Sequence, residues 1–464
     1  MFFRLFVIPI SLAAVGCTAT KSYDDVEETI QGRTGKTVYL PGRQLEQTDV
    51  HATVNAMLRR PLTAESAAQI ALLNSRRVRA TLEELRLSQA DLLEASIPSN
   101  PSLASSVRWP NEGSGRNTEF GLTADILNLL LLPLRRSLAL REYEAAKKRV
   151  SHELLDVVFE TKEAFYELQA ELQILKRIQT TAQVNEVSSE IAKRLREAGN
   201  ITALEMLQEQ TSALQSGVDI SRSKGGAAIA KEKVNRLLGL TTGQGRMWNP
   251  AEQFPTMPRS DPRLDSAESA AVENRQDLAA QAETLAAIQQ GFGLTTKMRY
   301  LTALNLGIDH EREVDGGRLT GPSLDIELPI FNFGQARVLK AKAEVARAVA
   351  TYEALDLEVR SDVRRAWQQL NVARQLYQQI TSTLLPQRQK ILGETLLQYN
   401  AMQVSNFVLL QAKTLELEAQ RAAVESLRDY WIARAELEKA AGGSFASSRR
   451  SSKSPAEVSS AHSH

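Results

Sequence analysis

Apolar residues recur with two different periods along this chain, and each period occurs in two places. A period of two marks four short segments. In one of them Phe120, Leu122 and Ala124 alternate with polar residues, so one side is apolar and the other polar. Such alternation predicts β-strands that are paired through the polar loops between them. The predicted strands cover about 102–109, 118–126, 296–309 and 319–328.

Apolar positions separated by steps of three and four residues mark the long segments that follow each strand pair. One series runs from Leu154 to Leu175 and the other from Val359 to Ile380. This spacing is typical of a coiled-coil seam, so it predicts long helices. Each helix turns back at a short polar stretch, "EAGNIT" in the first case and "NAMQVS" in the second. We interpret the apolar series as ordinary packing and not as a cofactor site.

Several landmarks occur twice at a nearly constant separation. The motif "AESAA" begins at Ala64 and again at Ala267, 203 positions later. Gly239 and Gly442, each at the end of a helical segment, have the same separation of 203. We interpret these matches as an ancestral duplication. The fold class is therefore mainly α with β, in which a unit of helix, two strands and a long helical hairpin is present twice.

This reading divides the chain into six parts. The ends of the repeats are set by the paired landmarks, and the segment between them is rich in proline. We predict a lipoprotein signal peptide at 1–16, an N-terminal linker at 17–61, a first repeat at 62–240, an irregular connecting segment at 241–264, a second repeat at 265–442 and a disordered tail at 443–464.

The first residues are typical of an exported protein. Arg4 precedes an apolar run from Leu5 to Val15, and small residues then lead to Cys17. This resembles a bacterial lipoprotein signal, in which Cys17 becomes the lipidated first residue. A plain signal peptide with an incidental cysteine is the alternative. Cys17 is the single cysteine of the chain, so a disulfide within one chain is excluded.

Charge and composition exclude several classes of function. The 56 basic and 55 acidic residues nearly cancel, and nucleic-acid binding needs a basic face to neutralise phosphates. The five histidines have no metal-ligand spacing, and no nucleophile motif or phosphate-binding loop is present. We therefore expect no enzyme activity, no cofactor and no bound metal.

Any membrane span in this chain would have to consist of strands. After the signal peptide no apolar run approaches the roughly 20 residues that a spanning helix needs. Four strands are also too few, because a membrane barrel needs at least eight and tolerates no open edge in lipid. The chain must therefore pool its strands with other copies, or remain outside the membrane.

The stretch "LDIELPIFNFGQARVLKAKAEV" closely resembles the strand-to-helix corner of the TolC-like outer-membrane efflux factors. "LTAESAAQIALLNS" and "SIPSNPSL" are similar to the opening helix and the helix-to-strand corner of that family. The resemblance runs over nearly all of residues 60–442. The residues assigned to the strand-to-helix corners are Pro133 in the first repeat, and Pro329, Phe331, Asn332 and Gly334 in the second.

The resemblance implies a homotrimer in which three sets of four strands close one twelve-stranded outer-membrane β-barrel. The paired long helices would continue it as an α-helical tunnel across the periplasm. A lipid-anchored protein of this kind conducts small molecules or ions from an inner-membrane transporter, through a periplasmic membrane-fusion adaptor, to the exterior. Its partners would be those two proteins and the lipid of the outer membrane.

The resemblance also assigns roles to the helix turns. The turns would contact the adaptor, and nearby residues would gate or line the tunnel. Glu205 and Gln411 also fit ordinary solvated helix faces, and that alternative remains open. Family members commonly have glycine where Met402 stands. The docking tips are Gly199, Asn200 and Thr202 in the first hairpin and Met402, Gln403 and Ser405 in the second, and the gate or lining residues are Glu205, Tyr399 and Gln411.

A lipid-anchored coiled-coil scaffold or adaptor without a pore is the alternative function. It would explain the helical periodicity and Cys17. It would leave the two amphipathic strand pairs unexplained. The sequence names neither the exported compound nor the pump.

Overall fold

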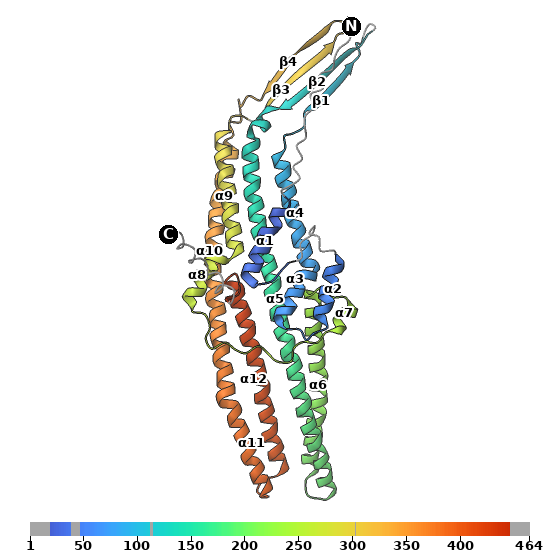
Figure 1. Ribbon diagram of the computed structural model, residues 1–464, viewed down its shortest axis with the longest axis vertical. Helices are drawn as coiled ribbons and strands as arrows, with labels where there is room; N and C mark the ends of the chain where they lie inside the picture. Colours follow the sequence, from blue (N-terminus) through green and yellow to red (C-terminus); the bar gives the residue numbers. More distant parts are fainter. Residues whose placement is uncertain (1–18, 39–46, 112–114, 302, 446–464) are drawn as a thin grey trace, which may run out of the picture.

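Two long helical paths set the shape of the molecule, with a small sheet at one end and two helix turns at the other (Figure 1). One path is the single helix α5 (Ile126–Glu197). The other consists of α10 (Gln335–Gln379), a π-helical segment η1 (Ile380–Leu384) and α11 (Leu385–Asn400). The computed structural model describes residues 19–38, 47–111, 115–301 and 303–445.

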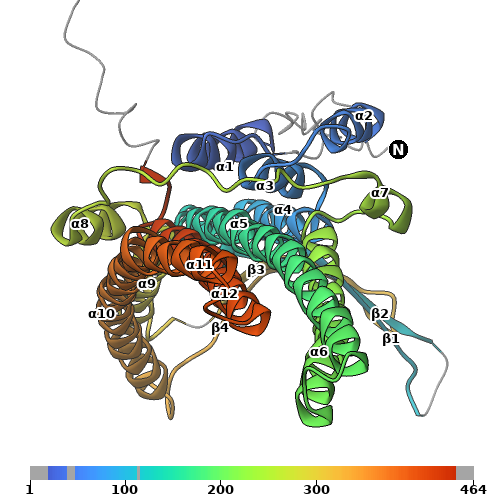
Figure 2. The same ribbon diagram turned by 90° about the horizontal axis from the view of Figure 1, so that it is seen from below.

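Both long paths change their partner helices half-way along. Near the sheet, α4 (Arg76–Ser96) packs on α5, and α9 (Gln276–Lys297) packs between α5 and α10. Toward the turns, α6 (Ala203–Leu237) packs on α5, and α12 (Asn406–Ala440) packs on α5, α10 and α11. Apart from the sheet, the long helices therefore form a curved layer (Figure 2).

Glycines make the two exchanges of partner possible. Gly239 follows α6 and Gly442 follows α12, with φ of 66° and 76°. A Cβ atom at Gly239 would lie 2.8 Å from the carbonyl oxygen of Asn74, and one at Gly442 would lie 2.8 Å from the carbonyl carbon of Asn274. Asn74 and Asn274 end the short helices that precede α4 and α9. Glycine is thus required both by the backbone angle and by the close approach of a second chain segment.

The sheet contains four antiparallel strands in the order β1-β2-β3-β4. Their bounds are Ser102–Arg108, Asn117–Asp125, Leu304–Arg312 and Arg318–Ile326. The central pair, β2 and β3, joins the two halves of the chain, with Leu122 opposite Ile308. Each half therefore contributes one hairpin, and the outer edges of β1 and β4 pair with nothing in the part of the chain that the structure describes.

Short helices form an outer layer around the middle of the molecule (Figure 2). The layer lies on one side of the long helices and leaves the other side concave. Trp248 is fully buried beneath it and stacks on Phe165 of α5, with 6.4 Å between ring centroids. The helices of this outer layer are α1 (Ala19–Thr34), α2 (Gln47–Leu58), α3 (Ala64–Asn74), α7 (Thr242–Met247) and α8 (Leu264–Asn274).

The third strand is the main error among the predicted elements. It was expected at 296–309 but begins at Leu304, because α9 continues to Lys297 and the amide of Met298 still donates to the carbonyl of Leu294 (2.9 Å). The other three strands begin and end within two residues of the expected ranges. Over the short stretch before Leu304, the apolar residues fit both the period of two of a strand and the period of 3.6 of a helix.

Three other expectations also need correction. The segment 17–61, expected as a linker, contains α1 and α2. The two "AESAA" motifs are not in equivalent places, since α3 and α8 have bounds that differ by 200 positions and not by 203. Pro133 lies inside α5 and not at the corner. The helix begins seven residues earlier because the Asp125 carboxylate accepts a hydrogen bond from the Asn128 amide (2.8 Å) and caps it.

The predicted signal peptide and Cys17 lie outside the described residues, as does most of the predicted tail. The tail begins as ordered structure, because the Ser444 amide donates to the carbonyl of Arg33 (2.9 Å). Along the described ranges, no helix has both the length and the apolar character needed to cross a membrane.

Candidate functional site

The first hairpin tip reverses the chain between α5 and α6 through two hydrogen bonds. The amide of Asn200 donates to the carbonyl of Leu195 (2.8 Å). The amide of Gly199 donates to the carbonyl of Arg196 (3.0 Å). Gly199 has a φ of 77° and no atom within 4 Å of its would-be Cβ. This is the Schellman arrangement that commonly ends a helix with a glycine.

The second tip, between α11 and α12, follows the same backbone path with a different residue. The amide of Gln403 donates to the carbonyl of Gln398 (2.9 Å), and that of Met402 to Tyr399 (2.9 Å). Met402 takes the place of the glycine with a φ of 58°, and among the described residues it alone has a positive φ without being glycine. A left-handed backbone costs an ordinary side chain about 1–2 kcal/mol. The Met402 side chain is also 95% exposed.

The two tips differ again where the next helix begins. Thr202 and Glu205 form a reciprocal cap on α6, in which the Thr202 hydroxyl accepts from the Glu205 amide (3.2 Å) and the Glu205 carboxylate accepts from the Thr202 amide (2.7 Å). The bonds from the Thr202 backbone and hydroxyl lower the pKa of Glu205. Ser405 stands at the start of α12 and makes no side-chain capping bond.

The remaining gate candidates are close to these tips. Tyr399 is 40% exposed and accepts the Met402 amide through its backbone carbonyl. Gln411 lies on an exposed face of α12. Glu205 therefore has a defined capping role, whereas Tyr399 and Gln411 have no side-chain partner that fixes their orientation within the described residues.

The strand-to-helix corner of the second half contains four of the expected residues. Pro329, Phe331, Asn332 and Gly334 lie between the end of β4 at Ile326 and the start of α10. The Asn332 side chain accepts from the Gly334 amide (3.0 Å), and Gly334 has a φ of 73°. A Cβ on Gly334 would meet the Arg299 carbonyl oxygen at 2.6 Å. Phe331 is 92% exposed, so an aromatic ring projects from the corner.

The sheet presents a continuous apolar face to the surroundings. The pairing register places Leu122 between Leu103 on β1 and Ile308 on β3. Leu306 lies opposite Leu324 in the same way. Leu122 is 51% exposed and Ile308 is 60% exposed. The opposite face is polar, with Ser106 and Arg108 beside Glu119 at 3.1 and 3.2 Å.

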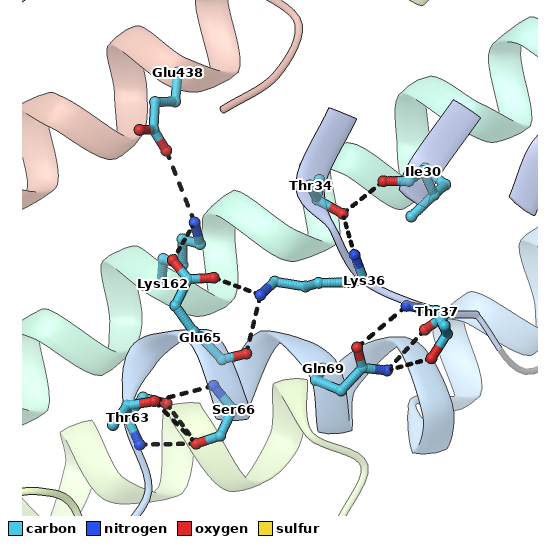
Figure 3. Close-up of polar contacts among 10 residues, drawn as sticks. All are labelled: Ile30, Thr34, Lys36, Thr37, Thr63, Glu65, Ser66, Gln69, Lys162 and Glu438. Carbon is cyan, nitrogen blue, oxygen red and sulfur yellow. Dashed lines mark hydrogen bonds and ion pairs between the residues drawn. The ribbon is translucent and has the colours of Figure 1, made fainter. Parts of the chain in front are cut away.

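A chain of charged residues crosses the middle of the molecule (Figure 3). Lys36 pairs with Glu65 on α3, and the same carboxylate accepts from Lys162 on α5 at 2.7 Å. Lys162 also lies 3.7 Å from Glu438 on α12. Burial lowers the pKa of Lys36 and raises that of Glu438, and in both cases an opposite charge offsets part of the effect. This series of ion pairs links the N-terminal segment to both helical hairpins.

A second buried charge holds the connecting segment to the second hairpin. Asp261 accepts from Arg374 on α10 (2.5 Å) and from the Tyr430 hydroxyl on α12 (2.8 Å). Arg434 adds a third contact at 3.2 Å. Breaking one partner of a buried pair typically costs about 3–5 kcal/mol. The segment is therefore fixed by specific ion pairs.

These two charge clusters were not expected from the sequence. Their members lie far apart along the chain, and single Lys, Glu and Asp residues in a sequence that is 24% charged carry no local signal. Proline enrichment near Asp261 indicated an irregular segment but not the ion pairs. Among the described residues, no three His, Cys, Asp or Glu side chains are placed to hold a metal ion.

Solved structures share this architecture. The outer membrane channel CmeC of Campylobacter jejuni matches with a TM-score of 0.71 at 16% identity, over 84% of this chain and 88% of that one. The outer membrane protein VceC of Vibrio cholerae matches with a TM-score of 0.69 at 16% identity, over 85% and 97%. The open MtrE outer membrane channel of Neisseria gonorrhoeae gives 0.65 at 16% identity, over 82% and 89%. This chain has the TolC-like fold.

The TolC-like fold is recognised here through structure and not through overall sequence similarity. No family model matches the chain, and neither does any curated protein sequence. At identities of 16% the comparison establishes the fold alone.

Proposed function

We propose that this chain is the outer-membrane exit duct of a tripartite efflux or secretion system. It would conduct small molecules or ions from an inner-membrane transporter, through a periplasmic adaptor, to the exterior. The observation that supports this proposal most is the exposed apolar face of a four-stranded sheet with two unpaired edges, at one end of a TolC-like fold. The solved structures with this fold support the same role, since CmeC and MtrE are outer membrane channels.

The unpaired edges give the reason for an oligomer. Backbone groups at an open edge have no hydrogen-bond partner in lipid, so a lone four-stranded sheet is not stable there. Three copies would supply twelve strands, joined β1 to β4 between neighbours, and would close a barrel. The helical layers would then close into a tunnel, with the concave face inward and the outer layer of short helices outside. We further propose that the two halves arose by duplication and that Cys17 is lipidated.

The hairpin tips would be the docking site for the adaptor. They are the part of the chain farthest from the sheet (Figure 1). The exposed Met402 side chain and the polar residues Asn200, Gln403 and Ser405 would form the contact surface. Glu205 in three copies would form an acidic ring near the tunnel mouth.

A pair of matched substitutions on one strand tests the membrane assignment. Leu122→Arg places a charge on the apolar face, which costs about 2–4 kcal/mol at the middle of a bilayer. Thr123→Arg places the same charge on the polar face one residue later. We expect Leu122→Arg to remove the protein from outer-membrane fractions, and Thr123→Arg to leave a trimer that conducts in planar bilayers. Equal recovery of both variants as a soluble monomer would favour the scaffold alternative.

The Glu205 ring is tested with a variant that keeps its cap. Glutamine can accept the same hydrogen bond from the Thr202 amide, because Glu and Gln serve equally in this capping motif. Glu205→Gln therefore removes the charge and retains the fold of the tip. We expect reduced cation preference in planar bilayers. Unchanged selectivity would leave Glu205 as a capping residue only.

A further inference from the structure

A cavity at the middle of the molecule contains an unusual pair of carboxylates. It has a volume of about 390 Å³ and is lined by residues of α5, α10 and α12 and by Arg275, which lies between α8 and α9. Glu163 comes from α5 in the first half, and Glu436 comes from α12 in the second. The cavity therefore lies on the seam between the two helical hairpins.

One lining residue of the cavity points to the concave side of the molecule. On α10, Trp367 donates to the carbonyl of Pro262 (3.0 Å), which lies in the segment that joins α7 to α8, and so Trp367 faces the side of the outer layer. Arg365, which lines the cavity, precedes Trp367 by two residues. Two residues turn a helix by about 200°, so Arg365 points away from the outer layer. In the proposed duct this side faces the tunnel.

Glu163 and Glu436 have no hydrogen bond or ion pair anywhere in the described ranges, although several cations surround them. Each of these cations is already paired with another carboxylate. The pairs are Lys439 with Asp156 (3.3 Å), Arg275 with Asp277 (2.6 Å) and Asp362 (3.3 Å), Arg365 with Asp362 (3.0 Å), and Lys233 of α6 with Glu167 (2.7 Å).

The environment of Glu163 favours its protonated form. Burial raises its pKa to about 7, and the nearby Glu436 carboxylate adds to the effect while Lys439 opposes it. Glu160 on the same helix also raises this pKa. A protonated carboxyl can donate a strong hydrogen bond to a carboxylate, whereas two ionised carboxylates repel each other.

We propose that Glu163 and Glu436 form a proton-operated latch between α5 and α12, which closes on acidification and loosens as the pH rises. Because the two helices belong to different hairpins, the latch sets how firmly the hairpins hold together at the waist. Its role in the tunnel rests on the proposed function, but its effect on the seam does not.

Besides Glu163, the residues of α5 that line the cavity are His152 and Asp156. The Nε2 atom of His152 lies 3.8 Å from Asp156 and 4.0 Å from Asp277. A positive charge on this ring would strengthen both contacts. A test of the latch must therefore separate Glu163 from His152.

The sign of the expected effect follows from the raised pKa. The folded protein binds the Glu163 proton more tightly than the unfolded chain does, so this group's stabilisation is full below pH 4.5 and is lost as the pH rises to about 7. Glu163→Gln imitates the protonated side chain. It should match the wild type in acid and exceed it at alkaline pH.

The experiment compares thermal unfolding of the purified full-length protein and its variants at pH 4.0 and pH 8.5, each against the wild type at the same pH. We expect the Tm of Glu163→Gln to be equal at the lower pH and raised by about 2 °C or more at the higher one. Hydrogen exchange of α12 peptides at pH 8.5 should slow several-fold in the same variant. Glu436→Gln should change both measurements in the same direction.

Two control variants make the test specific. Glu167→Gln removes a carboxylate one turn along α5 that is paired with Lys233, and it should give no gain at pH 8.5. His152→Asn should leave the response to Glu163→Gln in place. The latch is overturned if Glu163→Gln shows the same Tm difference from wild type at both pH values, or if His152→Asn abolishes the pH effect. A normal pH effect in a protein that does not conduct would retain the latch and reject the duct.

Discussion

The two hairpin tips have one backbone path but two different sets of residues. Both reverse through the same pair of hydrogen bonds, and both contain a residue with positive φ. The first tip has glycine there and a reciprocal cap, whereas the second has Met402 and an uncapped serine. The shared path must therefore be imposed on the second tip by the packing of α11 on α12, because its local sequence does not favour it. Such departures from local rules are typical of functional sites.

The largest effect is expected where a glycine has both a positive φ and a close neighbour. Gly239→Ala and Gly442→Ala should each cost about 2–4 kcal/mol, from backbone strain and from the forced shift of the opposing segment. Gly199→Ala, with open space around it, should cost only the strain of about 1–2 kcal/mol. Thermal unfolding of the purified proteins checks this order. Equal losses at all three positions would show that the junctions are not tightly packed.

An exchange of residues between the tips should move their stabilities in opposite directions. Met402→Gly should stabilise the second tip by about 1 kcal/mol, and Gly199→Met should destabilise the first by a similar amount. Hydrogen exchange of peptides that cover each turn measures the two effects separately. If Met402→Gly leaves exchange unchanged, the positive φ carries no strain in solution.

The caps should differ in the same measurement. Thr202→Ala removes a side chain that accepts the Glu205 amide, and it should cost the start of α6 about 1 kcal/mol. Ser405→Ala removes a side chain without a capping bond and should have little effect on α12. A similar acceleration of exchange in both variants would mean that Ser405 caps its helix after all.

The smallest expected effect concerns pH. The pKa of Glu205 is lowered in the folded tip, so its capping bond stabilises the tip above pH 4.5 and is lost as the pH falls below that value. Protection of the first tip, corrected for intrinsic exchange rates, should therefore decrease in acid relative to the second. Glu205→Gln should remove this dependence. If protection of the first tip decreases by the same amount in Glu205→Gln, the pH dependence belongs to another group.

The sequence was sufficient for the features that depend on local periodicity. Alternation identified both strand pairs, and it placed Leu122 and Ile308 each on the apolar face of its strand. The register that puts them opposite each other came only from the structure. The coiled-coil spacing identified the long helices. The start of β3 was missed because a helix that continues to Lys297 and a strand that starts at 296 have nearly the same apolar positions.

Features that depend on contacts between distant residues could not be predicted in this way. The pairing of Lys36 with Glu65 and of Asp261 with Arg374 is created only when the outer layer folds onto the long helices. The candidate tip residues came from resemblance to a family. Their individual roles depend on hydrogen bonds, such as that between Thr202 and Glu205, which the motif alone does not specify.

The change of offset between the two halves has a practical consequence for anyone who rebuilds this protein from parts. Equivalent positions are 200 apart before the long helices, as for Asn74 and Asn274, and 203 apart after them, as for Gly239 and Gly442. The second half therefore carries three more residues between these points, and a π-helical turn such as η1 holds one more residue than an α-helical turn. A chimera that exchanges whole hairpins at the junction glycines would keep both helix ends in register. One that joins the halves inside α10 would rotate everything beyond the splice by about 100° for each residue of error.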